Sequence, residues 1–190
     1  MSEDTAEVVS FTAMADGTAE DYALLARIEA EEMASFPDRV LGWLRTMQDS
    51  AGYPISRLDH SLQAATRAQR AGEDTETVVC VLLHDIGDYL SPANHSEVAA
   101  AVLRPYVSDK NYWIVKHHGV FQGFYYYHHT GENPNARDQW KDHPYYQATV
   151  DFCANYDQVS FDPSYRSESL PFFEPMVREI LSEERRQHGT

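Results

Sequence analysis

The stretch that decides the fold covers residues 78–87 and reads VVCVLLHDIG. Its first six residues are all apolar, which predicts a helix near 75–86 that is buried on nearly all sides. The run ends in His84-Asp85, and an ionised carboxylate at the end of a buried helix is costly unless a cation meets it. A divalent metal would satisfy both side chains. A hydrogen-bonded histidine beside a loop-capping aspartate is an equally weighted alternative.

Helix patterns continue on both sides of this stretch. Thr18 followed by Asp21 is typical of a helix N-cap with an acidic first turn, and Ser56 can cap another helix. The helices predicted besides the central one lie near 19–34, 40–47, 56–70, 92–103, 109–121, 144–157 and 172–181. Residues 122–142 and 161–171 are expected to be loops. Because no alternating strand of useful length is found, the predicted fold class is all-α.

The length of the chain predicts one domain. It has 190 residues, and roughly 70% of the surface of an unfolded chain of this size is buried on folding, so a core can form without disulfides. Residues 1–17 are small and polar and are predicted to be a flexible arm. A single helical domain is then expected over residues 18–190.

Composition excludes several classes of protein. The 15 Lys and Arg residues against 30 Asp and Glu give a net charge of −15, which would repel a nucleic-acid backbone. No apolar run approaches the ~20 residues of a membrane helix, and the acidic start lacks the layout of a signal peptide. Cys80 and Cys153 lie in apolar segments, which favours reduced thiols and a cytoplasmic protein. The expected partner is a small molecule, and the chain is expected to be a monomer or homodimer.

Further candidate metal ligands lie on neighbouring predicted helices. His60 lies on the helix before the central one, His95 opens the helix after it, and Asp157 ends a later helix. The adjacent pair His117-His118 lies near the end of the 109–121 helix, and either ring fits a buried face. Helical bundles build metal sites from side chains on facing helices. From spacing alone, the alternative for both His60 and His95 is a solvent-exposed position.

Together with His84 and Asp85, these positions supply four imidazoles and two carboxylates. Six donors are too many for one tetrahedral zinc with an open position. They suit two metal ions that share a bridging carboxylate and keep open positions for water, O₂ or substrate.

The order His60, His84-Asp85, Asp157 resembles that of the HD-domain superfamily of metal-dependent enzymes. The segments similar to ligand regions of the HD-type di-iron oxygenases are residues 54–63, 82–87, 94–99 and 155–157. This group comprises the phosphonate-cleaving dioxygenases and, more distantly, myo-inositol oxygenase. The resemblance covers about residues 54–157.

The resemblance implies an HD-domain helical bundle with the metal site at its centre, and Asp85 as the catalytic, bridging carboxylate. It implies two metal ions, foremost mixed-valent iron, with Mn, Mg or Zn as alternatives. The implied ligands are His60, His84, Asp85, His95, one of His117 and His118, and Asp157. Trinuclear relatives use both members of the adjacent pair, so both stay candidates.

Departures from these relatives bear on the substrate. The relatives place cationic side chains at three positions. This chain has Asp88 at the first, Phe121 or Gln122 at the second and Ala154 at the third, so a phosphonate would lack charge-assisted donors. Asp88 instead favours a substrate that bears a hydroxyl or an amine. Alternatively, Asp88 simply caps the loop at Gly87.

Three further side chains are candidates for substrate binding. Tyr53 stands where the relatives have Glu, and it could cover an open metal position or pack in the turn. Gln122 and Tyr125 belong to a tyrosine-rich segment that could line a substrate mouth, a dimer surface or a packed loop.

Two enzyme functions are therefore expected. A di-iron oxygenase would use O₂ to cleave or oxidise a small substrate bearing a hydroxyl or an amine. The alternative is an HD-type metal-dependent phosphohydrolase that acts on a phosphoester or nucleotide. A binding-only domain is the third hypothesis, and it requires the six donors to be a coincidence.

Overall fold

The computed structural model describes residues 7–50 and 52–182, and within these ranges it contains no strand. The helices are α1 Ala19–Ala34, α2 Phe36–Thr46, α3 Arg57–Ala71, α4 Thr75–Leu83, α5 His95–Leu103, α6 Asp109–Gln122, α7 Tyr127–Thr130, α8 Tyr146–Phe152 and α9 Leu170–Leu181. The predicted all-α class is therefore confirmed. In the described ranges, no helix is both long and apolar enough to span a bilayer.

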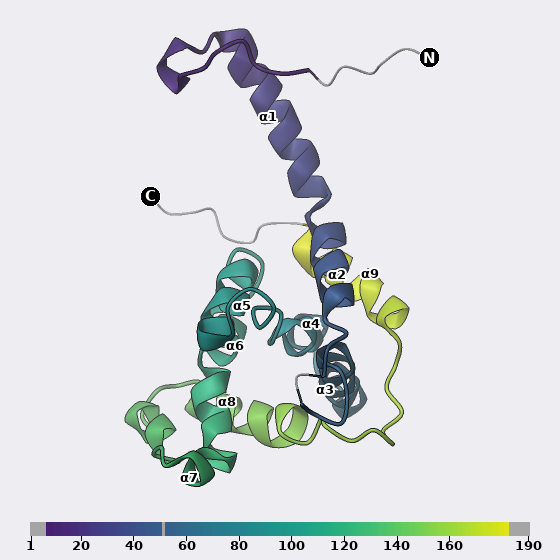
Figure 1. Cartoon of the computed structure of the whole chain (residues 1–190), viewed down its shortest axis with the longest axis vertical. Coiled ribbons are helices and arrows are strands. Elements are labelled where there is room, and N and C mark those ends of the chain that lie inside the picture. The colour runs from purple at the N-terminus through teal and green to yellow at the C-terminus, as the bar shows by residue number, and fades with distance from the viewer. Residues whose placement is uncertain (1–6, 51, 183–190) are drawn as a thin grey trace.

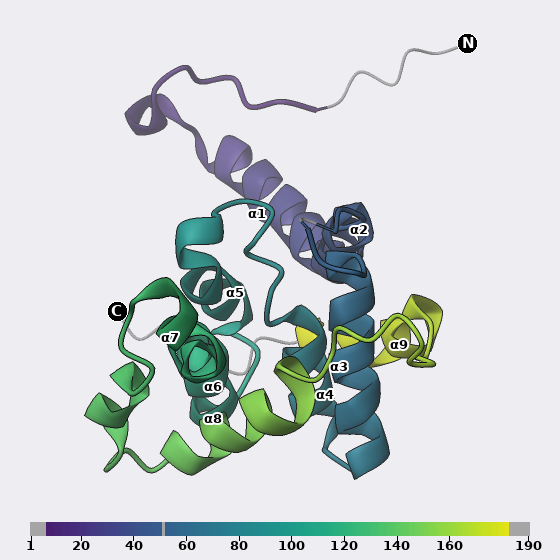
Figure 2. The same ribbon diagram turned by 60° about the horizontal axis from the view of Figure 1, so that its bottom comes forward.

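Helix α4 is the central element of the body. It contacts α3, α6 and α9, and Figures 1 and 2 show α3 and α4 as one pair of helices and α5 and α6 as another. Its residues Val79, Val81, Leu82 and Leu83 have no exposed surface. This is the burial on all sides that the uninterrupted apolar run 78–83 predicts.

The ends of α3 are set by local chemistry. The Ser56 hydroxyl accepts a hydrogen bond from the backbone N–H of Asp59 at 3.0 Å, and the Asp59 carboxylate accepts from Ser56 in return. Such a capping box stabilises the first turn. Gly72 ends the helix with φ of 83°, a left-handed conformation that side chains other than glycine disfavour.

Helix α9 covers one side of the hydrophobic core. Its residues Phe173, Val177, Ile180 and Leu181 are buried, and the helix packs on α2 and α4. The apolar residues recur at helical spacing, so one face of α9 is apolar and adds to the core.

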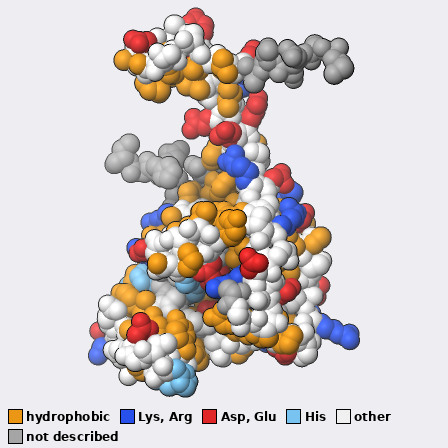
Figure 3. All heavy atoms as spheres, viewed as in Figure 1, with side chains coloured by type: hydrophobic (Ala, Val, Ile, Leu, Met, Phe, Trp, Pro, Cys, Tyr) orange, Lys and Arg blue, Asp and Glu red, His pale blue; other side chains and the backbone are white. Residues whose placement is uncertain are grey.

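Helix α1 projects away from the body (Figure 1), and hydrophobic side chains show at its outer end in Figure 3. The predicted cap is present, because the Thr18 hydroxyl accepts from the N–H of Asp21 at 3.2 Å. Phe11 of the preceding segment stacks on Tyr22, with ring centroids 5.7 Å apart. The arm at 1–17 and the domain at 18–190 stay predictions, and residues 1–6 and 183–190 lie outside the described part.

The structure departs from the sequence prediction in three segments. Helix α4 ends at Leu83, so the residues that follow leave the helix axis in turns. The predicted helix 144–157 is α8 followed by a wider π-helical segment, Cys153–Asp157. The expected loop 122–142 contains short helical turns, including α7, because its aromatic side chains pack on α6.

Candidate metal centre

Six polar side chains from five elements converge beside the C-terminal end of α4. They are His60 of α3, His84 and Asp85 after α4, His95 of α5, His118 of α6, and Asp157 at the end of the π-helical segment. Only tertiary packing brings them together, since His60 and Asp157 lie 97 positions apart in the chain.

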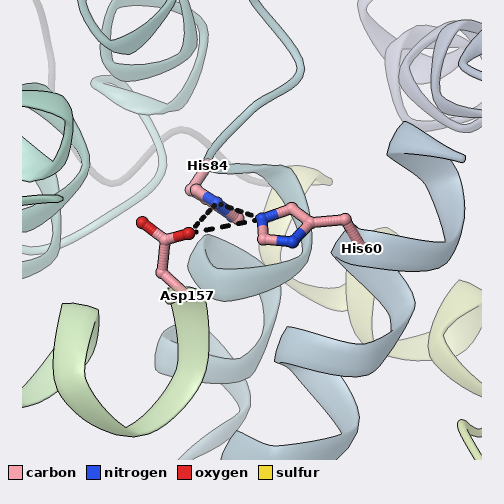
Figure 4. A group of neighbouring side chains, drawn as sticks. All are labelled: His60, His84 and Asp157. Carbon is pink, nitrogen blue, oxygen red and sulfur yellow. Dashed lines mark hydrogen bonds and ion pairs between the residues drawn. The ribbon is translucent and has the colours of Figure 1, made fainter. Parts of the chain in front are cut away.

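We call His60, His84 and Asp157 the buried half of this cluster (Figure 4). The Nε2 atoms of His60 and His84 lie 3.2 Å apart. Asp157 Oδ1 lies 3.3 Å from the first of these nitrogens and 3.7 Å from the second. All three side chains are almost wholly shielded from solvent. The three donor atoms therefore surround one small volume, as ligands of a single ion would.

We call His95 and His118 the open half. Their Nε2 atoms lie 3.3 Å apart, and each faces Asp85 Oδ1, at 3.5 Å from His95 and 3.2 Å from His118. The His95 side chain is 26% exposed, whereas that of His118 is only 2% exposed. The open half is thus reached from solvent along His95.

Asp85 lies between the two halves. Its Oδ2 lies 3.6 Å from His60 Nε2 and 3.5 Å from His84 Nε2, while its Oδ1 faces the open half. One oxygen is therefore directed to each histidine pair, which is the arrangement of a carboxylate that bridges two ions. Burial raises the pKa of Asp85, but the neighbouring rings, His84 foremost, outweigh it and hold that pKa well below its usual range.

Charge also perturbs the buried half. Burial lowers the pKa of His84, but Asp85 and Asp157 outweigh this effect and raise that pKa to about 9. Two carboxylates in a shielded volume thus demand positive charge at the Nε2 atoms. A proton on His84 meets part of that demand, and a divalent cation would meet more of it.

The hydrogen bonds of the imidazoles test whether metal ions fit. In all four rings Nδ1 faces a backbone carbonyl oxygen: Ser160 for His60, Val81 for His84, Pro92 for His95 and Val115 for His118. A carbonyl only accepts, so each Nδ1 carries the proton. In the neutral ring, Nε2 then presents a lone pair to the cluster. Lone pairs that face one another at 3.2–3.3 Å repel unless a proton or a metal ion lies between them, so the residues present fit two metal ions.

His117 does not join the cluster. Its Nδ1 bonds to the carbonyl of Trp113 at 2.9 Å, and its ring stacks on the Trp113 indole at 3.7 Å between centroids. His118, the next residue, turns into the cluster instead. The structure thus places His118, and not His117, beside Asp85, whereas sequence spacing left the two rings open.

A cleft of about 490 Å³ opens onto the cluster. Figure 3 shows acidic, basic and histidine side chains close together on this face. The four predicted substrate-binding residues all line the cleft: Tyr53, Asp88, Gln122 and Tyr125. From the cluster, Asp85, His95, His118 and Asp157 also line it, whereas His60 and His84 do not.

The predicted substrate-binding residues Tyr53, Gln122 and Asp88 differ in how they are held. Tyr53 is half exposed and stacks on Phe161, with centroids 4.9 Å apart. Gln122 Nε2 donates to Asp157 Oδ1 at 3.0 Å, so it helps to orient a candidate ligand. Asp88 forms an ion pair with Arg57 and lies 3.5 Å from His95 Nδ1. Burial, helped by Asp85, raises the pKa of Asp88.

Sequence reasoning missed three residues of the site. Arg57 lines the cleft and lies three residues before His60 on α3, a spacing that places both on one helix face. Phe161 stacks on His60 at 4.4 Å between centroids. Gly87 lets the backbone of His95 approach closely, since a Cβ there would collide with the His95 carbonyl. The spacing could have indicated Arg57, but no local signal indicates the other two.

The comparisons with known proteins agree with this geometry. A model of the HD domain family matches residues 57–148. No curated protein matches the chain. The family match and the buried histidine-aspartate cluster together indicate a metal-dependent enzyme. The segment that matches the HD domain family, residues 57–148, carries five of the six converging side chains, all but Asp157.

Proposed function

We propose that this HD-domain protein is a di-iron oxygenase that uses O₂ to cleave or oxidise a small substrate bearing a hydroxyl or an amine. The observation that carries the proposal is Asp85, which directs one carboxylate oxygen to each of two histidine pairs. Four imidazoles and two carboxylates form a nitrogen-rich donor set for two ions. Imidazole suits iron among the redox metals.

The residues of the chain would divide the work between them. His60, His84 and Asp157 would hold one ion away from solvent, while His95 and His118 would hold the other beside the cleft. Iron, when bound, supplies the one-electron chemistry that activates O₂. Gln122 would orient Asp157 through its hydrogen bond, and Tyr53 and Tyr125 would shield the substrate from water.

An HD-type phosphohydrolase that acts on a phosphoester or nucleotide is the second candidate. The observation in its favour is Arg57, a cation at the cleft that could bind a phosphoryl oxygen. In that case Mn, Mg or Zn would supply Lewis acidity, and no redox change would be needed. Three acidic side chains, Asp85, Asp88 and Asp157, line the same cleft and weaken its attraction for a phosphate dianion.

Metal analysis of freshly purified protein separates the two functions. Two irons per chain, a spin-resonance signal after partial reduction, and substrate-dependent O₂ uptake would support the oxygenase. Protein that holds Mn, Mg or Zn and hydrolyses p-nitrophenyl phosphate would contradict it and support the phosphohydrolase. The expected partners stay a small molecule and O₂, without nucleic acid.

A further inference from the structure

We propose that Arg57 binds a carboxylate group of the substrate, which makes the substrate a small carboxylic acid with a hydroxyl on the adjacent carbon. This inference deepens the proposed function and depends on it for the role of the cleft. It begins with Arg57, the cation of the cleft that sequence reasoning missed.

The position of Arg57 follows from the start of α3. It is the first residue of that helix and lies one turn before His60, so its side chain extends toward the cluster. Its NH1 lies 3.8 Å from Asp85 Oδ2, and 28% of the side chain is exposed. A group bound to this guanidinium would therefore be a direct neighbour of the bridging carboxylate.

Two contacts besides that with Asp85 hold the guanidinium in place. Asp88 forms an ion pair with it, and the ring of Tyr53 lies 5.4 Å below its central carbon. These contacts use one edge and one face of a planar group that has five N–H donors. The remaining donors are available to a ligand at the cleft, and the orientation is set before the ligand arrives.

The donors of the cleft favour a carboxylate over a phosphonate. Within the described ranges, Arg57 is the one lysine or arginine that lines the cleft. Apart from the histidines, the uncharged polar side chains that line it are tyrosines and glutamines. A planar fork matches the two oxygens of a carboxylate. A phosphonate dianion presents three oxygens and a second charge, which Asp88 would repel.

The open half indicates where the hydroxyl lies. His95 and His118 line the cleft, whereas His60 and His84 do not, so a small substrate reaches the open half first. A carboxylate on Arg57 would lie beside Asp85, whose other oxygen, Oδ1, faces His95 and His118, so a hydroxyl on the adjacent carbon would be near the open half. The aromatic residues Tyr53, Tyr126 and Phe161 would then contact any larger substituent.

Three small probes with the same hydroxymethyl group test this inference: glycolate, hydroxymethylphosphonate and ethylene glycol. We expect calorimetric titration of the metal-loaded protein without O₂ to show glycolate binding at least about tenfold more tightly than either of the others. Arg57→Gln should weaken glycolate about tenfold or more and leave ethylene glycol unchanged. Arg70→Gln is the matched control, because Arg70 lies on the same helix but pairs with Glu168 away from the cleft.

Tighter binding of the phosphonate than of glycolate, or equal glycolate binding by the wild type and Arg57→Gln, would overturn the inference. If Arg57→Gln loses its metal ions, Arg57→Lys takes its place: it keeps the charge, loses the fork and should weaken glycolate less. The order of the three probes on the wild type decides in either case. Because O₂ is absent, failure of the oxygenase in the O₂-uptake assay leaves this result unaffected, and the two failures are distinguishable.

Discussion

The buried and open halves of the cluster use the same chemistry in different surroundings. His60, His84 and Asp157 are almost wholly shielded, whereas His95 keeps 26% of its side-chain surface exposed and lines the cleft. Burial makes the first group costly to assemble without a cation, so this half couples metal binding to folding. Exposure makes the second group accessible to a ligand. If two ions bind as proposed, the difference in burial predicts that the ion of the buried half stabilises the fold and the ion of the open half meets the substrate.

The largest effect should come from Asp85, since it serves both halves. Asp85→Ala should empty both metal positions. The free energy of unfolding should then fall by the lost binding energy, which is about 4 kcal/mol when the free metal concentration is 1,000 times its Kd, and the melting temperature should fall with it. Elemental analysis and calorimetry measure both quantities. A variant that retains two metal ions per chain would contradict the bridging role.

Substitutions within each half should separate stability from metal content. His84→Ala removes one imidazole partner from both Asp85 and Asp157 in a shielded volume, so it should remove the buried ion and destabilise the protein by about 2–4 kcal/mol. His95→Ala should remove only the ion of the open half and cost less than about 1 kcal/mol of intrinsic stability. Chelator-treated samples compare the two variants. Equal destabilisation would mean that the halves do not differ as described.

Gly87→Ala should act on the open half alone. The added Cβ would collide with the backbone carbonyl of His95 and displace that ring from Asp85. We expect about tenfold weaker binding of one of the two ions, with the other unchanged, because a strained ligand loses coordination geometry. Titration of the metal-free variant with Mn²⁺, followed by spin resonance, measures both affinities. Unchanged affinities would show that α5 can shift without cost.

The buried half should show its own pH dependence. Without metal, the pKa of His84 rises from 6.5 to about 9, so this group stabilises the metal-free protein fully below pH 6.5 and ceases to do so as the pH rises through about 9. Metal must displace the same proton and therefore binds more tightly toward pH 9. The melting temperatures of loaded and chelated protein should diverge between these values. If the difference between the two melting temperatures stays constant between pH 6.5 and about 9, His84 does not titrate in this range.

The smallest effect is expected for His117. Because its ring stacks on Trp113 and lies outside the cluster, His117→Ala should retain both ions and lose only packing, about 1 kcal/mol. Its neighbour His118 offers the matched comparison, since His118→Ala should lose the ion of the open half. Loss of metal from the His117 variant instead would reverse the assignment within the pair.

Much of the fold was predictable because its signals are local. An uninterrupted apolar run at 78–83 predicts a helix buried on all sides, and capping residues such as Thr18 and Ser56 mark helix starts. The π-helical segment was not predictable, because the spacing of the apolar residues up to Asp157 is also compatible with a regular α-helix. Its wider turn forms where Asp157 and Ser160 are held against His60.

The sequence by itself determined the class of the fold, the buried position of α4, and a set of histidines and aspartates able to bind metal. These follow from hydrophobic spacing and side-chain chemistry, which every residue carries wherever it lies. Tertiary structure alone decided that His118 rather than His117 faces Asp85, and that Arg57 reaches the cleft. Successive side chains on a helix point about 100° apart, so the rotation of α6 against α4 selects one ring, and that rotation is a property of the packed core.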